Sequence, residues 1–302
     1  MNYQEFITNI RENIALRVEA GTVLQIQSIV KNNGTGYDGL IMMRPNLNIS
    51  PTIYLNPYYH RFLEGVSLED IYNDILEVYY NHLPEESFDV TRYTDFEKVR
   101  DNIVYRLVNY ERNADLLKQV PFVPFLDLAI IFYCQLEASE NQQASILVYN
   151  HHMEQWGQDT ASLMEHAKCN TPRLFPWQLE DMQKYIRELH PNCISPKELP
   201  ENTMYILTNK YRNYGAAVLL YDDLIRKLAM KLHSDLVIIP SSIHELLLIP
   251  ANSRQTLSYC DDMVRTVNET QVADDEILAD HAYYYSLDDC QITFRSPQPL
   301  AQ

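Results

Sequence analysis

One stretch of the chain constrains the fold more than any other: the sixteen residues DLVIIPSSIHELLLIP at 235–250. Two apolar runs of strand length flank a short polar turn, which is the pattern of an antiparallel hairpin with largely buried strands. The turn carries Ser241, Ser242, His244 and Glu245, so hydroxyl, imidazole and carboxylate groups crowd together between two stiff segments. Because an isolated hairpin is only marginally stable, other elements must cover this one.

Hydrophobic periodicity predicts the other elements. Helical spacing of apolar residues favours helices at 3–19, 67–79, 94–110, 159–167, 177–189, 222–232 and 253–267. Alternating or continuous apolar runs between turn residues favour strands at 23–30, 40–43, 52–55, 126–136, 145–149, 204–208 and 216–221. Two of the helices begin with a hydroxyl and an acid three residues later, Ser67 with Asp70 and Thr94 with Glu97, which is a capping pattern.

A hairpin is followed by a helix three times, within residues 23–82, 126–167 and 235–268. This recurring ββα order favours antiparallel or mixed sheets with helices on one face. The sequence therefore predicts an α+β fold, built from ββα-like units with covering helices.

Proline marks the expected divisions of the chain. Pro191, Pro196 and Pro200 crowd the stretch before the C-terminal strands, so we place the main boundary or linker near 191–200. The predicted regions are an N-terminal α+β region at 1–120, a central hairpin–helix region at 121–195, a C-terminal α+β domain at 196–290 and a flexible tail at 291–302.

The chain is strongly acidic, with 24 basic and 41 acidic residues and a formal net charge of −17. A phosphate-backbone binder needs clustered Lys and Arg, so direct nucleic-acid binding is not expected. The acids stand in short groups, at 85–86, 222–223, 261–262, 274–276 and 288–289. Such groups are typical of a solvated surface, whereas acids aligned in space would imitate DNA and capture a nucleic-acid-binding protein.

The five cysteines are odd in number, widely separated and without a CxxC pair, so we expect reduced thiols rather than disulfides. Charged residues interrupt any apolar signal core near the N-terminus, and no run approaches the roughly 18 apolar residues of a membrane span. The expected location is the cytoplasm, with no membrane contact. Nothing in the sequence indicates an oligomeric state.

No motif for a cofactor or a metal stands out. The glycine-containing segment at 32–36 lacks the lysine of a Walker loop and joins two strands, so we interpret it as a hairpin turn. His151, His152 and Glu154 could approach one metal ion, but only Asp159 and His166 are near enough in sequence to complete a ligand set. We expect a polar loop there, no metal and no cofactor.

The turn at 241–245 is the strongest candidate site. In an extended strand Ser242 and His244 would point to the same side and Glu245 away from them. A hydroxyl beside an imidazole is the minimum for a serine nucleophile with a base, yet no third triad member and no G-x-S-x-G elbow is visible. In the structural alternative, Ser241 and Ser242 satisfy the turn backbone and His244 packs at a strand start.

Two other predicted loops place amide and hydroxyl groups beside a proline. The first contains Asn48 and Ser50, and the second contains Asn170 and Thr171 before Arg173. Each could hold a ligand, and each is equally well explained as turn chemistry. The candidate binding residues are therefore Ser241, Ser242, His244, Glu245, Asn48, Ser50 and Arg173.

Five sequence blocks carry a resemblance to known families: NISPTIYL at 48–55, PFLDLA at 124–129, NTPR at 170–173, MYILTN at 204–209 and PSSIHE at 240–245. Together they resemble an uncharacterised family of clostridial proteins, a domain of unknown function from gut Firmicutes, over most of residues 1–285. The middle and C-terminal blocks are more distantly similar to YtpQ-like bacillus proteins, with Trp156 and Gly157 preceding a short helix. Neither family has an established activity, so the resemblance implies no residue roles.

The sequence favours a non-catalytic binding or regulatory module that recognises a protein or a small ligand through loops near Ser242 and His244. One alternative is a hydrolase or transferase with Ser242 as nucleophile and His244 as base. A second alternative is an acidic DNA mimic.

Overall fold

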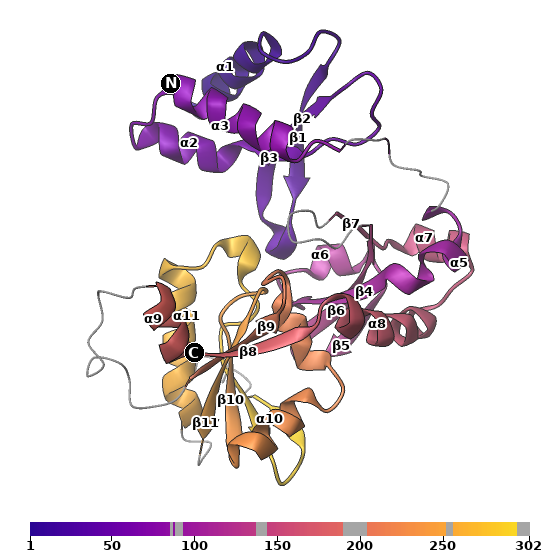
Figure 1. Ribbon diagram of the computed structural model, residues 1–302, viewed down its shortest axis with the longest axis vertical. Coiled ribbons are helices and arrows are strands. Elements are labelled where there is room, and N and C mark those ends of the chain that lie inside the picture. The colour runs from indigo at the N-terminus through magenta and orange to yellow at the C-terminus, as the bar shows by residue number, and fades with distance from the viewer. Residues whose placement is uncertain (85–86, 88–92, 137–143, 190–203, 252–255, 295–302) are drawn as a thin grey trace, which may run out of the picture. The chain divides into compact units, whose positions relative to one another are not determined.

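The computed structural model spans residues 1–302 and describes all of them except 85–86, 88–92, 137–143, 190–203, 252–255 and 295–302. The chain forms two compact units, Met1–Tyr93 and Thr94–Gln302. Both combine helices with antiparallel strands (Figure 1), which confirms the predicted α+β class. The boundary predicted near 191–200 lies entirely outside the described residues and stays a prediction.

The first unit packs helices on a three-stranded sheet of order β1-β2-β3. Its strands are β1 (Val23–Val30), β2 (Gly36–Met43) and β3 (Thr52–Tyr54), with the short 3-10 turn η1 (Asn32–Gly34) in the first hairpin. Its helices are α1 (Tyr3–Ala15), α2 (Leu55–Leu63) and α3 (Leu68–Asn81). The hairpin of β1 and β2 is confirmed, and α1 and α3 confirm the helices predicted at 3–19 and 67–79. The helix α2 was not predicted from the sequence.

Capping and burial explain why these helices form where they do. The Ser67 hydroxyl accepts a hydrogen bond from the Asp70 N–H at 3.2 Å, so the predicted cap at the start of α3 is confirmed. The apolar stripes of the helices and one face of the sheet meet in a common core, which contains Phe6, Ile10, Ile14, Leu40, Met42, Ile53, Leu55, Ile71, Ile75 and Tyr79.

The second unit contains two antiparallel sheets. The smaller sheet has the order β4-β6-β5, with β7 also paired to β6; its strands are β4 (Ile103–Asn109), β5 (Phe122–Phe125), β6 (Leu128–Gln135) and β7 (Ser145–Leu147). The larger sheet has the order β13-β12-β10-β11-β9-β8, with strands β8 (Trp177–Asp181), β9 (Tyr205–Asn209), β10 (Asp235–Pro240), β11 (Leu246–Ala251), β12 (Tyr283–Ser286) and β13 (Gln291–Thr293).

Helices and 3-10 turns connect and cover these sheets. They are α5 (Phe96–Val99), η2 (Arg100–Asn102), α6 (Ala114–Leu117), α7 (Asn150–Trp156), α8 (Thr160–Leu174), α9 (Met182–Leu189), η3 (Gly215–Leu220), α10 (Leu224–Leu232), α11 (Thr256–Thr270) and η4 (Asp274–Glu276). α8 packs on β4, where the Thr171 hydroxyl accepts from the Tyr105 N–H at 3.1 Å. α11 packs on β10, around Val237, Cys260 and Val264.

The hairpin at 235–250 is confirmed, because β10 pairs with β11 from Asp235 opposite Ala251 to Pro240 opposite Leu246. It lies within the larger sheet rather than at an edge, with β12 and β9 on its two sides. All but one residue of β10 is buried, which agrees with its continuous apolar run.

Three local predictions are wrong. The helix predicted at 94–110 is only α5 and η2, and Ile103–Asn109 forms β4, because a buried run rich in β-branched and aromatic residues satisfies strand packing as well as helical spacing. The strand predicted at 216–221 is η3, a buried apolar run too short for periodicity to classify. The helix predicted at 177–189 begins with β8, which pairs with β9.

The C-terminal tail was predicted to be flexible over 291–302. Gln291–Thr293 instead forms β13 and pairs with β12, because the exposed edge of β12 can add another strand. Residues 295–302 lie outside the described part of the chain.

An ion pair joins the two sheets of the second unit. His281 Nε2 lies 2.8 Å from Asp127 Oδ2, and the Tyr283 hydroxyl donates to Asp127 Oδ1 at 2.7 Å. Burial, the largest single influence, lowers the pKa of His281, but the hydrogen bond and charge attraction of Asp127, together with the Ala282 carbonyl and the Asp261 charge, outweigh it and raise this pKa above its ordinary value. Burial alone raises the pKa of Asp127, but the His281 and Tyr283 hydrogen bonds lower it below its ordinary value.

These pKa shifts predict a pH window for the contribution of the pair to stability. The His281 contribution is complete below an unfolded pKa of about 6.5 and is lost as pH rises through the raised folded pKa. The Asp127 contribution is complete above an unfolded pKa of about 3.9 and is lost as pH falls through the lowered folded pKa. The pair therefore stabilises the fold most in weakly acidic solution.

We expect His281→Gln to lower the free energy of unfolding by about 2 kcal/mol near pH 6 and by clearly less near pH 9, as measured by urea denaturation. Lys118→Gln is the control, because it removes an exposed pair with Asp115 and should change stability by less than about 0.5 kcal/mol at both pH values. An equal loss for His281→Gln at the two pH values would contradict this assignment.

Candidate functional site

The structure places the Ser242 hydroxyl in the turn backbone rather than against the His244 ring. Ser242 Oγ accepts a hydrogen bond from the main-chain N–H of His244 at 3.0 Å, and the Ser242 N–H lies 3.4 Å from the Glu245 carbonyl. Residues 241–245 belong to neither strand, so the alternation of side chains expected for a strand does not apply to them. This geometry matches the structural alternative, in which the serine satisfies turn groups.

Both ring nitrogens of His244 are directed at other groups. Nδ1 accepts from the Tyr214 N–H at 3.0 Å, so the proton of the neutral ring sits on Nε2, which faces Glu276 Oε1 at 3.5 Å. Burial lowers the pKa of His244, and the nearby Glu276 carboxylate opposes this shift without cancelling it. The ring thus anchors neighbouring segments and is not positioned as a base for Ser242.

The main chain of the same turn holds η3 in place. The Thr208 hydroxyl donates to the His244 carbonyl at 2.7 Å, and the Ala216 N–H donates to the Ile243 carbonyl at 3.2 Å. Gly215 fits into this junction only because it lacks a Cβ: an added Cβ would lie 2.0 Å from Thr208 Oγ1 and 2.4 Å from the His244 carbonyl oxygen.

Ser241 and Glu245 close the other side of the turn. The Ser241 hydroxyl lies 3.4 Å from Glu245 Oε1, and Glu245 Oε2 lies 3.9 Å from Arg212 Nη1. Arg212 also pairs with Glu180 on β8. These contacts tie the hairpin turn to the edge of the larger sheet.

The remaining predicted binding residues lie elsewhere. Asn48 and Ser50 belong to the first unit, where the Ser50 hydroxyl donates to the Met42 carbonyl at 3.0 Å. Arg173 lies on α8 rather than in the predicted loop, because the helix continues through Pro172 to Leu174. It donates to the main-chain carbonyl of Asp101 and to Asn170 Oδ1 at 3.2 Å. Each contact that the structure shows for Ser50 and Arg173 is with neighbouring protein groups.

A buried arginine lies next to this turn. Arg106 is 7% exposed and its guanidinium stacks on the rings of Tyr133 and Tyr214, with centroid distances of 3.8 and 3.7 Å. Its Nη2 donates to the Ser145 hydroxyl at 2.8 Å. The cavity beside it has a volume of about 10 Å³, room for about one water molecule. The ring stacking therefore serves to stabilise a buried cation rather than to admit a ligand.

The predicted polar segment at 151–154 belongs to α7 rather than to a loop. His152 Nδ1 accepts from the Tyr149 N–H at 3.0 Å, and burial lowers the pKa of His152 to about 4. Within the described residues, no group of three His, Cys, Asp or Glu side chains could hold a metal ion.

A larger cleft lies between α8, β8, η3 and α10 of the second unit. Its volume is about 400 Å³, within the range of roughly 300–1,000 Å³ that is typical of small-molecule sites. It is lined by Lys168, Pro172, Trp177, Leu220, Tyr221, Asp222, Leu224, Lys227, Leu228 and Lys231. We call it the lysine cleft.

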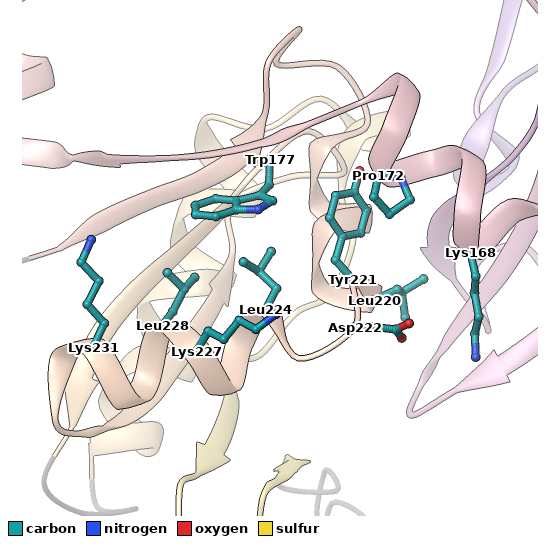
Figure 2. Close-up of a pocket in the computed structure, with 10 residues that line it drawn as sticks. All are labelled: Lys168, Pro172, Trp177, Leu220, Tyr221, Asp222, Leu224, Lys227, Leu228 and Lys231. Carbon is teal, nitrogen blue, oxygen red and sulfur yellow. The ribbon is translucent and has the colours of Figure 1, made fainter.

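The walls of the lysine cleft are apolar and aromatic. Leu224 and Leu228 are buried on the inner face of α10, and Figure 2 shows the indole of Trp177 facing them from β8 across the cleft. Trp177 is 46% exposed, which is high for the largest aromatic side chain, so one face of its ring is available for contact.

Three lysines surround these apolar walls. Lys227 and Lys231 stand four residues apart on the same face of α10, whereas Lys168 comes from α8 and lies at the other end of the cleft (Figure 2). Among the described residues, no carboxylate forms an ion pair with any of the three. In the described part of the chain, Asp222 is the one carboxylate that lines the cleft.

Tyr221 determines how the walls of the cleft meet. Its hydroxyl donates to the Phe175 carbonyl at 2.6 Å and lies 3.4 Å from the Thr171 carbonyl, both at the C-terminal end of α8. Burial raises the pKa of Tyr221, so the hydroxyl stays protonated and keeps its role as donor. This bond connects the start of α10 to α8.

The lysine cleft was not predicted from the sequence, although the positions of two of its lysines on a predicted helix could have indicated it. On the helix predicted at 222–232, Lys227 and Lys231 each follow a buried leucine by three residues, so both border its apolar stripe. Trp177 and Lys168 gave no signal of their own, because they come from segments distant from that helix in sequence.

The fold and the cleft together define a class: an α+β protein with a cation-lined, partly aromatic cleft. The chain matches the model of a family of unknown function, DUF5688, over residues 3–287, and it belongs to that family. Comparisons with curated proteins and with solved structures gave no match. In the part of the chain that the structure describes, no helix combines the length and the apolar character needed to cross a bilayer.

The junction at Gly215 gives a prediction on stability. Gly215→Ala forces a Cβ against Thr208 and the His244 carbonyl, so we expect the free energy of unfolding to fall by about 3 kcal/mol in urea denaturation. Gly36→Ala is the matched control, because a Cβ there meets no atom within 4 Å, and it should change stability by less than about 1 kcal/mol. Equal effects of the two substitutions would show that the junction is loosely packed.

The geometry of the turn gives a prediction on reactivity. Since His244 is directed at Tyr214 and Glu276, we expect a fluorophosphonate probe to label the folded protein no more than it labels Ser242→Ala, as measured by mass spectrometry. Labelling of Ser242 that disappears in His244→Ala would instead support the serine nucleophile.

Proposed function

We propose that this protein is a non-catalytic binding protein whose lysine cleft holds a small anionic molecule with an apolar part. The observation that carries the proposal is the gathering of Lys168, Lys227 and Lys231 around an apolar cleft, in a chain with a net charge of −17. In so acidic a protein, a cluster of cations without carboxylate partners among the described residues favours an anion as the complementary group.

The energetics of such binding combine two contributions. Burying about 100 Å² of ligand apolar surface, chiefly against the exposed indole of Trp177, stabilises the complex by about 2.5 kcal/mol. Charge attraction adds to this; because Lys168, Lys227 and Lys231 are all exposed, each ammonium group contributes at most about 1 kcal/mol. Neither contribution alone gives a specific site, whereas both together select an anion with an apolar part.

The proposal keeps the binding role expected from the sequence and assigns it to a different surface. Ser242 and His244 are engaged in contacts that hold the turn and η3, and these contacts support a structural role. No observation favours the hydrolase or the DNA-mimic alternative over a binding role.

An anionic aromatic dye, anilinonaphthalene sulfonate, tests the proposal by its fluorescence. We expect the double variant Lys227→Gln, Lys231→Gln to raise the Kd of the dye about tenfold, equivalent to about 1.4 kcal/mol. The matched control is Arg226→Gln on the same helix, which removes one cation outside the cleft that lies 3.8 Å from Asp223. We expect its Kd to stay within about twofold of the wild-type value.

Two results would count against the lysine cleft. One is an equal loss of dye binding in the Arg226→Gln control and in the double variant. The other is binding by the double variant at the wild-type Kd, with both proteins showing the same cooperative thermal unfolding.

A further inference from the structure

We infer that the ligand of the lysine cleft is a phosphate monoester joined to a flat ring, the chemistry of a nucleoside monophosphate. This inference rests on the proposed function of the cleft and names the class of molecule that it holds. It is carried by the charge balance of the lining, by the type of cation and by the exposed indole.

The charge balance favours a doubly charged anion. Three ammonium groups face a single carboxylate, that of Asp222, so the lining carries two positive charges in excess. A carboxylate ligand neutralises one of these charges. A phosphate monoester, with a second pKa of about 6, neutralises nearly both at neutral pH.

The use of lysine as the cation in the lining is compatible with a phosphate ligand. All three cations of the lining are lysines, and no arginine contributes to it. Arginine presents a planar fork that matches carboxylate and phosphate alike, whereas lysine acts as a mobile point charge and is itself a common phosphate ligand, so a lining of lysines suits a phosphate. Lys227 and Lys231, one helical turn apart on α10, can approach one phosphate group together.

The indole supplies the surface for a flat ring. Figure 2 shows Trp177 above Leu224 and Leu228; the two leucines are buried and the indole is 46% exposed, so a planar group stacks on the exposed part of the indole. Aromatic side chains stack on nucleobases with little preference for the base, because every base has a π face. The cleft thus favours a nucleobase without specifying which one.

The position of Asp222 orients the ligand. Its carboxylate lies toward the Lys168 end of the cleft, away from Lys231 (Figure 2), and it repels a phosphate. The phosphate therefore lies with Lys227 and Lys231. Asp222 is left to accept hydrogen bonds from sugar hydroxyls, a role that acidic residues have in nucleotide sites.

Calorimetry on the wild-type chain tests the inference with AMP, adenosine and inorganic phosphate as probes. We expect AMP to bind at least about tenfold more tightly than either fragment, and UMP to bind within about tenfold of AMP. The affinity for AMP should increase severalfold from about pH 5 to about pH 7.5 as the phosphate loses its second proton, whereas that for the sulfonate dye should not.

A fluorescence experiment locates the bound ring. The chain has two tryptophans, and Trp156 is buried on α7, so Trp156→Phe leaves Trp177 as the one indole that reports. We expect saturable quenching of Trp177 by AMP, lost in Lys227→Gln, Lys231→Gln and kept in Arg226→Gln. A second variant, Lys227→Arg, Lys231→Arg, keeps the charges and should retain at least part of the binding.

The outcomes separate this inference from the proposed function. Lysine-dependent dye binding without AMP binding overturns the inference and leaves the proposed function standing. Adenosine or inorganic phosphate binding as tightly as AMP also overturns it, because then the ring or the phosphate alone is recognised. Loss of both dye and AMP binding to the folded wild-type chain overturns both proposals.

Discussion

The lysine cleft depends on one buried hydrogen bond, from the Tyr221 hydroxyl to the Phe175 carbonyl at the end of α8. The last carbonyls of a helix have no partner within the helix, and burying them unpaired is costly. Tyr221 is 6% exposed, so water competes little for this bond. By satisfying the end of α8, it fixes the segment carrying Lys168 and Trp177 against the start of α10.

The hairpin turn at 241–245 holds η3, the segment that leads into Tyr221, in place. Its carbonyls bind Thr208 and the first residues of η3, and η3 leads directly into Tyr221. Gly215 allows this close approach because it has no side chain. The turn that draws attention in the sequence therefore supports the lysine cleft, which other residues line, and its hydroxyl and imidazole make structural contacts.

Local sequence patterns predicted the elements whose signals are local. The cap at Ser67 and the hairpin at 235–250 were expected and are present, because each depends on residues a few positions apart. Ile103–Asn109 was assigned to a helix, since its apolar residues fit both helical spacing and a buried strand. Only pairing with β6 decides between the two, and that partner is distant in sequence, from Asn109 opposite Leu128 to Ile103 opposite Cys134.

The sequence by itself determined the α+β class, the net charge of −17 and the strand pairing of the central hairpin, because periodicity, composition and turn residues can be read without the tertiary structure. The tertiary structure alone decided which residues form a cleft. Lys168, Trp177 and Lys231 come from a helix, an edge strand and a second helix, and each alone resembles an ordinary surface residue. Their proximity results from the packing of α8 and α10 around Tyr221, a constraint that no local pattern encodes.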